Sequence, residues 1–302
     1  MWFIFAVATF LMWGAADLFY KRASNPSDKY SHLKIVVMVG LIMGIHAVIY
    51  MITEGLTFSP VSIIKYLPVS SMYILSMAIG YFGLRYIELS ISSPVQNSSG
   101  AVVAILLLIF FPRAVGALEI IALGLICGGV FTLSLLENRR ENPARYIKEN
   151  KSDAKYRTGM LAILFPIIYC VIDGLGSFAD AIYLDELELM AEAEALLAYE
   201  FTFLICGVAA FIFLRFVHKE DFNIFKAKNE AIAAIFETAG QYFYVFALSG
   251  NALLAAPIIA SYSIVSVILS RIFLKEKLSK GQYTIIATVM LGIALLGFVE
   301  GG

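Results

Sequence analysis

Five ionisable side chains in this sequence of 302 residues stand inside long apolar stretches, where charge is rarely found. They are Asp17, His46, Asp173, Glu200 and Glu237. At the centre of a bilayer, a carboxylate costs roughly 2.5–3.5 kcal/mol on an insertion scale, whereas each leucine or isoleucine contributes about 0.3–0.6 kcal/mol. The four acids would carry a large negative charge if all were ionised, so protons or a cationic ligand must balance some of them. The pattern favours an amine-bearing or cationic substrate, or proton coupling.

Aromatic and amide side chains accompany the acids at helical spacing. Trp13 precedes Asp17 by four residues and Tyr169 precedes Asp173 by four, so each pair shares one face of a helix. A further stripe with the spacing i, i+4, i+7 consists of Glu237, Gln241 and Tyr244. An aromatic ring beside a carboxylate suits an amine, because the face of the ring attracts a cation. These helix faces are candidate walls of a polar cavity.

The same acids also have structural interpretations, which the sequence leaves open. The two aspartates could bond to backbone groups opened by neighbouring glycines. The two glutamates could pair with His46 or Arg85 and so hold helices together. Both interpretations would place the acids in the interior without giving them a ligand.

The segments that carry these side chains are too apolar for a water-soluble protein. Hydrophobic residues make up 60% of the chain and charged residues 15%, against roughly 45–50% and about 25% in soluble domains. A membrane-spanning helix needs about 20 mostly apolar residues, and in lipid its backbone must be bonded within the segment. The sequence therefore predicts an all-α integral membrane protein with ten spans. They cover residues 2–20, 34–53, 62–84, 91–111, 116–136, 159–181, 194–216, 229–248, 252–273 and 281–299.

The ten segments fall into two halves, 1–136 and 159–302, joined by a basic linker at 137–158. Two features recur at similar positions in each half. Trp13 to Asp17 in the first segment stands against Tyr169 to Asp173 in the sixth, and Pro94 in the fourth stands against Pro257 in the ninth. Since five spans are an odd number, the second half is expected to be an inverted copy of the first. Transporters built in this way hold their site at the interface between the repeats.

Prolines and small residues mark where these helices should bend or pack closely. Pro94 and Pro257 are each followed by polar residues that include Asn97 and Tyr262, and both prolines are expected to kink their spans. The spacings Gly40-x-x-x-Gly44 and Gly124-x-x-x-Gly128 predict close contact between helices.

Lysine and arginine are concentrated in alternate connections. Of the 22 basic residues, only Lys65, Arg85 and Arg113 lie outside the odd-numbered connections. Because basic loops stay on the cytoplasmic side, the count predicts a multi-pass plasma membrane protein with both termini outside.

Enzyme motifs are absent from the sequence. It has no H-E-x-x-H, G-x-S-x-G or P-loop, and its three histidines lie far apart on different segments. We therefore predict no catalytic residue, no metal and no cofactor. The basic linker is read as a topology signal, so nucleic acid is not an expected partner.

The C-terminal stretch resembles a known family. A segment with Ser261-Tyr262-Ser263 leads into Leu274-Lys275-Glu276-Lys277-Leu278-Ser279 and a glycine-containing last helix, and Trp13-Gly14 stands in the first segment. These features resemble the drug/metabolite transporter superfamily, EamA-like type, over nearly the whole chain. The resemblance implies a secondary transporter of metabolites, often amino acids or related compounds, that works by alternating access without ATP. The first half departs from the pattern, because Phe111-Pro112-Arg113-Ala114 stands where the turn's glutamate is expected. The family also implies cytoplasmic termini, opposite to the charge count.

The combined expectation is a secondary transporter, monomeric or homodimeric, with a small-molecule substrate bound between the repeats. The predicted substrate-binding residues are Trp13, Asp17, Asn97, Tyr169, Asp173, Glu237, Gln241 and Tyr262. The candidates for proton coupling are Asp17, Asp173, Glu200 and Glu237. The alternative is a membrane-embedded lipid-handling protein, a flippase or head-group transferase, which a lateral opening between helices would favour.

Overall fold

The computed structural model describes residues 1–25, 27–140, 164–276 and 278–301. Over these residues the chain is all-helical, with 83% of it in helices and no strand, as the sequence predicts. The predicted linker at 137–158 lies outside the described residues from position 141 onward.

The helices of the first half occupy the chain up to residue 140. They are α1 (Trp2–Ala23), α2 (Ser31–Thr53), α3 (Pro60–Gly83), α4 (Leu89–Gln96), α5 (Ser99–Phe110) and α6 (Ala117–Arg140). In the second half, several helices end in a π-helical turn (η). The order is α9 (Leu164–Ala181), η2 (Ile182–Glu186), α10 (Glu192–Ile212), η3 (Phe213–Val217), η4 (Ile224–Lys226), α11 (Lys228–Ala260), α12 (Ser263–Leu269), η5 (Ser270–Leu274) and α13 (Lys280–Gly301), where η4 is a 3-10 turn.

Eight helical stretches among the described residues are long and apolar enough to cross a membrane. The longest, Lys228–Leu274, covers 47 residues. Within it the backbone of Asn251 is extended, with φ −173°, at the place where the sequence predicts the connection between two spans. The apolar part of α6, Ala117–Leu133, is shorter than the other stretches.

Two of the predicted spans are interrupted helices. The span predicted at 91–111 is divided into α4 and α5 by a turn at Asn97 and Ser98, and α11 is separated from α12 at Ser261 and Tyr262. Each break follows a proline, which supplies no amide hydrogen to the helix. Nearby hydroxyl groups then bond to the backbone in place of amides. Ser98 Oγ donates to the Pro94 carbonyl at 3.0 Å, and Ser261 Oγ donates to the Ile258 carbonyl at 2.5 Å.

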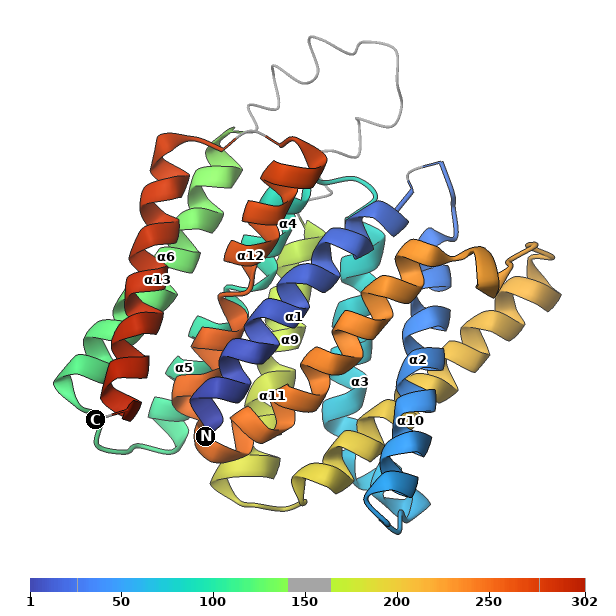
Figure 1. The fold of residues 1–302 in the computed structure, drawn as a ribbon, viewed down its shortest axis with the longest axis horizontal. Coiled ribbons are helices and arrows are strands. Elements are labelled where there is room, and N and C mark those ends of the chain that lie inside the picture. The colour runs from blue at the N-terminus through green and yellow to red at the C-terminus, as the bar shows by residue number, and fades with distance from the viewer. Residues whose placement is uncertain (26, 141–163, 277, 302) are drawn as a thin grey trace.

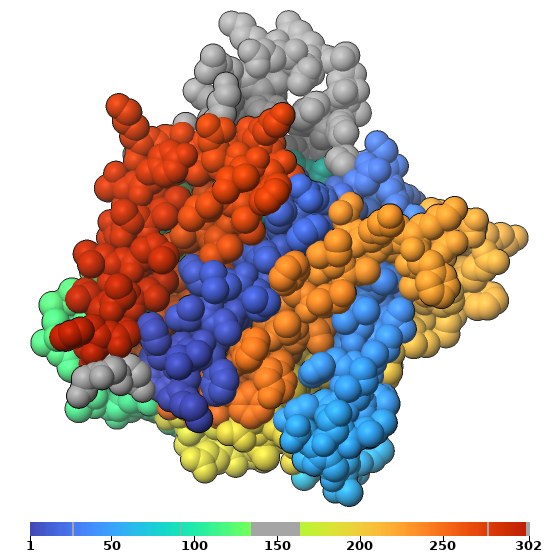
Figure 2. Space-filling view, in the orientation of Figure 1, coloured from blue at the N-terminus to red at the C-terminus, as the bar shows by residue number. Residues whose placement is uncertain are grey.

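The helices pack in four main pairs, of which α1 with α11 and α9 with α3 are called the crossed pairs. α1 runs along α11 on one face, and Figure 2 shows these two segments side by side. α9 packs along α3, α2 packs on α10, and α6 packs on α13. Each of these four pairs joins a helix before residue 141 to one after residue 163. Figure 1 places the start of α1 and the end of α13 at the same end of the bundle, which we call the terminal end. The opposite end, where α1 ends and α2 and α13 begin, is called the basic end.

Close packing is found at one of the two predicted glycine motifs. A Cβ atom on Gly40 would lie 2.5 Å from the Phe203 carbonyl oxygen, so α2 and α10 touch through their backbones. The prediction for Gly124 and Gly128 is wrong, because a Cβ at either position would meet no atom within 4 Å. The contact between α6 and α13 falls instead at Gly129, where a Cβ would lie 2.2 Å from Val289. A shift of one residue rotates the contact by about 100° around the helix.

Candidate functional site

A cavity of about 810 Å³, counting the space that is continuous with solvent, lies in the middle of the bundle. Its wall is formed by α1, α3, α4, α5, α9, α10 and α11 together with Tyr262. The structure brings all eight predicted substrate-binding residues to this wall. They are Trp13, Asp17, Asn97, Tyr169, Asp173, Glu237, Gln241 and Tyr262.

Asp17 lies on α1 between the two interrupted helices. Its Oδ2 atom accepts hydrogen bonds from Ser93 Oγ at 2.6 Å and from Ser266 Oγ at 2.7 Å, and the residue is 7% exposed. These partners come from α4 and α12, one on each interrupted helix. The sequence left open that Asp17 bonds to backbone groups. In the structure its hydrogen-bond partners are serine hydroxyl groups instead.

Asp173 occupies a similar position on α9. Its Oδ2 atom accepts a hydrogen bond from Ser99 Oγ at 2.8 Å, and Ser99 is the first residue of α5. Tyr169, one turn earlier, also faces the cavity. Both aspartates are thus held by serines that flank the break between α4 and α5.

Glu237 is the third acid on the wall. Tyr20 donates its hydroxyl hydrogen to Glu237 Oε2 at 3.2 Å, and Trp13 Nε1 donates to the Glu237 carbonyl at 3.3 Å. The Trp13 ring lies 5.1 Å from that of Tyr244 and 5.8 Å from that of Tyr262, measured between centroids. The indole therefore forms an aromatic corner next to the carboxyl group. Glu237 bonds to Tyr20 rather than to the partners considered from the sequence, His46 and Arg85.

Tyrosine dominates the rest of the wall. The lining tyrosines are Tyr20, Tyr73, Tyr81, Tyr169, Tyr199, Tyr244 and Tyr262. Four of these tyrosines were not predicted from the sequence, namely Tyr20, Tyr73, Tyr81 and Tyr199. Two signals were available, because Tyr20 follows Asp17 by three residues, and Tyr73, Met77 and Tyr81 are spaced by four on α3. Among the described lining residues there is no lysine, arginine or histidine.

Glu200, a candidate for proton coupling, is not among the described residues that line the cavity. It lies on α10, fully buried, and its Oε1 atom is 2.7 Å from His46 Nδ1 on α2. The His46 ring stacks on Tyr50 and meets the edge of Tyr242. The structural interpretation, in which Glu200 pairs with His46, is confirmed for this acid.

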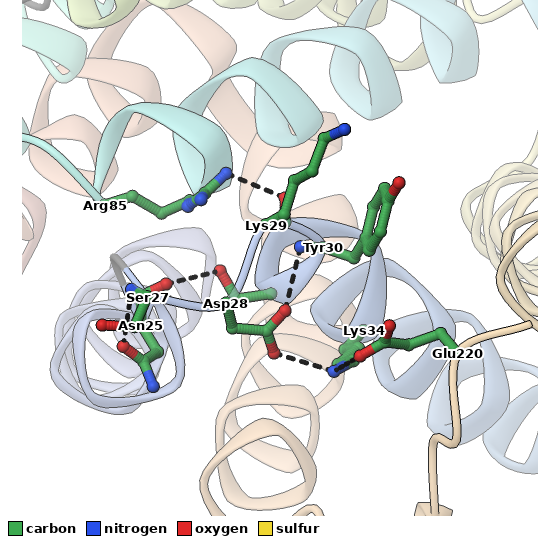
Figure 3. A network of polar contacts seen from close by, with 9 residues as sticks. Asn25, Ser27, Asp28, Lys29, Tyr30, Lys34, Arg85 and Glu220 are labelled. Atoms are coloured by element: carbon green, nitrogen blue, oxygen red, sulfur yellow. Dashed lines mark hydrogen bonds and ion pairs between the residues drawn. The ribbon is translucent and has the colours of Figure 1, made fainter. Parts of the chain in front are cut away.

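Polar bonds tie the connections at the basic end to one another, as Figure 3 shows. Arg85 donates to the Lys29 carbonyl at 2.9 Å, and Lys34 Nζ bonds to Asp28 at 2.8 Å and to Glu220 at 3.0 Å. Deeper in the same region, Lys21 Nζ donates to the Leu84 carbonyl at 2.7 Å and also to that of Ile87. The connections after α1, α3 and α10 are therefore linked at this end.

Metal ligands do not gather anywhere in the described ranges, where no group of three or more histidine, cysteine, aspartate or glutamate residues could hold an ion. The wall of the cavity offers carboxyl groups, hydroxyl groups, amides and aromatic faces. Such a surface can hold an organic cation through charge, hydrogen bonds and aromatic contact.

Comparisons with known proteins agree with this arrangement. The EamA-like transporter family matches residues 160–298. The crystal structure of another protein has a similar fold, with a TM-score of 0.67 and 10% sequence identity, covering 99% of this chain and 96% of that chain. No curated protein matches the sequence. At this identity the crystal structure shows the fold alone.

Proposed function

Because residues 160–298 match the EamA-like transporter family, we propose that the chain is a transporter of the drug/metabolite superfamily that moves small amine-bearing solutes by alternating access. The family indicates a membrane transporter of small solutes. The substrate class, the coupling and the mechanism are our proposal.

The charge of the cavity wall carries this proposal. Three acids, Asp17, Asp173 and Glu237, face a cavity whose described lining includes no basic side chain. A protonated amine would balance this charge, and the corner of Trp13, Tyr244 and Tyr262 offers it aromatic faces. An amino acid would also bring a carboxylate, which would find no cation among these residues. Amines without a carboxylate are therefore favoured over amino acids.

Proton exchange follows from the same group of acids. Carboxylates enclosed in a low-dielectric interior repel one another and lose hydration, so an empty cavity favours protons on some of them. A bound amine can replace those protons. Asp17 and Asp173 are the proposed exchange sites, since both lie on the wall and are held by serine hydroxyls that can donate to an ionised carboxylate. Glu200 is less suited to the exchange because it lies away from the wall.

Alternating access is supported by the way the helices pair. The crossed pair of α1 with α11 is matched by α9 with α3, and the break between α4 and α5 is matched by that between α11 and α12. We propose ten spans in two inverted repeats, 1–136 and 159–302, counting α11 as two spans separated at Asn251 and α6 as a complete span. Interrupted helices facing a site between repeats are typical of secondary transporters.

The orientation that we propose follows the basic residues. Connections at the basic end carry most of the lysines and arginines, whereas the terminal end carries acids such as Asp185, Glu186 and Glu192. The positive-inside rule then places the basic end in the cytoplasm and both termini outside a plasma membrane. Labelling of a cysteine at position 2 by an impermeant reagent in intact cells tests this orientation.

The lipid-handling alternative requires access from the side of the bundle. Every described residue of the cavity wall is buried or half-buried, and none is exposed. This favours an enclosed site for a solute over a groove for a lipid head group.

A binding experiment tests the substrate class. Purified protein in nanodiscs is titrated with radiolabelled phenethylamine, and phenethyl alcohol, phenylacetate and phenylalanine serve as neutral, anionic and zwitterionic competitors of similar size. Phenethylamine should bind, and the three competitors should displace it poorly. Asp17→Asn and Asp173→Asn should each weaken binding by about 10- to 150-fold, because a hydrogen bond to a charged group contributes about 1.5–3 kcal/mol.

The matched control is Glu54→Gln, which removes an exposed acid at the end of α2. It should leave the affinity unchanged. Equal displacement by phenylacetate or phenethyl alcohol would show that the charge of the wall does not select the ligand. Uptake of phenethylamine into proteoliposomes, driven by an imposed pH gradient, then tests transport itself.

A further inference from the structure

Asp180 is a second kind of buried acid in this protein, separate from the cavity wall. It lies near the end of the span predicted at 159–181, at the start of a stretch rich in acids that runs to Glu194. In the structure α9 ends at Ala181 and continues into the π-helical turn Ile182–Glu186. Asp180 is 0% exposed and is not among the described residues that line the cavity. It lies near the last residue of α9, toward the terminal end of the bundle.

A chain of hydroxyl groups connects Asp180 to the cavity. Tyr66, on α3, donates its hydroxyl hydrogen to Asp180 Oδ1. Tyr73 lines the cavity, and its hydroxyl oxygen lies 3.4 Å from Asp180 Oδ2. The Tyr73 hydroxyl also bonds to Ser177 Oγ at 2.9 Å and to the Tyr244 hydroxyl. The chain thus joins α3, α9 and α11 between the cavity and the terminal end.

The hydroxyl of Tyr73 has one hydrogen and two lone pairs for three partners. It can donate to an ionised Asp180, or it can accept from a protonated Asp180 and donate to Ser177 or Tyr244. Hydrogen bonds can therefore form in either protonation state, and what distinguishes the two states is the charge that the closed network encloses.

No cation contacts Asp180 among the described residues. Tyr66 and Tyr73 face it from α3, and the other titratable groups nearby are tyrosines or acids. They are Tyr199 on α10, Tyr244 on α11, Asp173 on α9, and Tyr183, Asp185 and Glu186 on η2. Lys65, next to Tyr66 on α3, is exposed. Arg113 is engaged with Asp185, at 3.4 Å, and with Glu186. Closure around an ionised Asp180 is therefore unfavourable, and closure around the protonated form is not.

We propose that Asp180 is the proton-operated latch of a gate at the terminal end of the cavity, closed with Tyr66, Tyr73 and Tyr244. Its proton stays bound while the gate is closed. Ionisation favours the open state, because water can then hydrate the carboxylate. The inference rests on the proposed transport function, and it assigns proton-controlled gating to a residue outside the substrate site.

The test measures access to the cavity without any substrate. Val103, on α5, lines the cavity and is 1% exposed. A Val103→Cys reporter is made in a chain whose own cysteines, Cys127, Cys170 and Cys206, are replaced by alanine. Membrane vesicles are prepared with the amino terminus on their outer face, and an impermeant thiol reagent is added outside at a series of pH values.

Asp180→Asn, which resembles the protonated form, should label about tenfold more slowly than the parent, since a gate's minor state is commonly populated at 0.1–10%. Its rate should vary with pH only as the thiol ionises, so the ratio of parent to variant should rise with pH. Tyr66→Phe keeps the carboxyl group but removes a hydrogen bond that closes the gate, and should label faster than the parent. The opposite signs separate a latch from general damage to the fold.

Equal rates in the parent and in Asp180→Asn across the pH series would overturn the proposal, as would a ratio that does not change with pH.

Phenethylamine binding distinguishes this failure from that of the proposed function. Asp180→Asn should bind phenethylamine as tightly as the parent, but should take it up at least tenfold more slowly under a pH gradient. If labelling behaves as expected but phenethylamine neither binds nor moves, the gate stands and the amine assignment fails. If phenethylamine uptake is unchanged in Asp180→Asn, the gate fails and the amine assignment stands.

Discussion

Replacing Gly240 by alanine should damage the cavity through a single steric contact. A Cβ atom at this position would lie 2.3 Å from Trp13 Cδ1 and 2.5 Å from Trp13 Nε1. These atoms belong to a rigid ring, which donates to the Glu237 carbonyl at 3.3 Å. The indole must therefore leave its position and move toward the cavity. Overpacking of this kind costs about 1–3 kcal/mol, and if binding requires the original position, affinity for phenethylamine falls by about 5- to 150-fold.

The assay is equilibrium dialysis of radiolabelled phenethylamine against the protein in nanodiscs. Gly124→Ala is the control, because its Cβ would meet no atom within 4 Å. A double-mutant cycle with Trp13→Ala isolates the collision. Without the indole, Gly240→Ala should have almost no further effect. The reasoning is refuted if Gly240→Ala binds like the parent, or if it weakens binding equally in the Trp13→Ala background.

Two further predictions concern stability rather than binding. His46→Ala should leave the buried Glu200 without its partner and destabilise the protein by about 1–3 kcal/mol; a lower thermal unfolding temperature that is restored by also replacing Glu200 with leucine would confirm the cause, and an unchanged temperature would contradict it. Gly40→Leu should lower the unfolding temperature far more than Gly124→Leu, because only Gly40 touches backbone of a facing helix. Equal shifts for the two glycine variants would show that close packing of α2 on α10 is unimportant.

Many residues of the cavity wall could be predicted because residues that are four positions apart lie on the same face of a helix. Trp13 with Asp17, and Tyr169 with Asp173, occupy one face of a helix at a spacing of four, and the structure places both pairs on the same wall. Polar residues inside an apolar span have few places to go other than an interior cavity. The position of each helix face could therefore be read from the sequence without knowing which helices are neighbours.

Asp180 and Glu200 show where that reasoning fails. Asp180 lies within the span predicted at 159–181, but it was not among the predicted site residues, and in the structure it bonds to Tyr66 and Tyr73. Glu200 lies in an apolar span like the acids of the wall, but its side chain faces His46 on α2. Spacing along one helix does not reveal which neighbour a side chain meets, since this depends on contacts between residues far apart in the sequence.

The pairing of helices across the chain constrains how the bundle can move. α2 is fixed to α10 by backbone contact at Gly40, and α6 is fixed to α13 at Gly129. Each of these pairs takes one helix from each half, so the halves cannot swing apart as two rigid blocks without breaking close-packed contacts. We expect the two pairs to act as a stationary frame during the proposed alternating access. The motion that opens one end of the cavity and closes the other would then fall to the crossed pairs, α1 with α11 and α9 with α3.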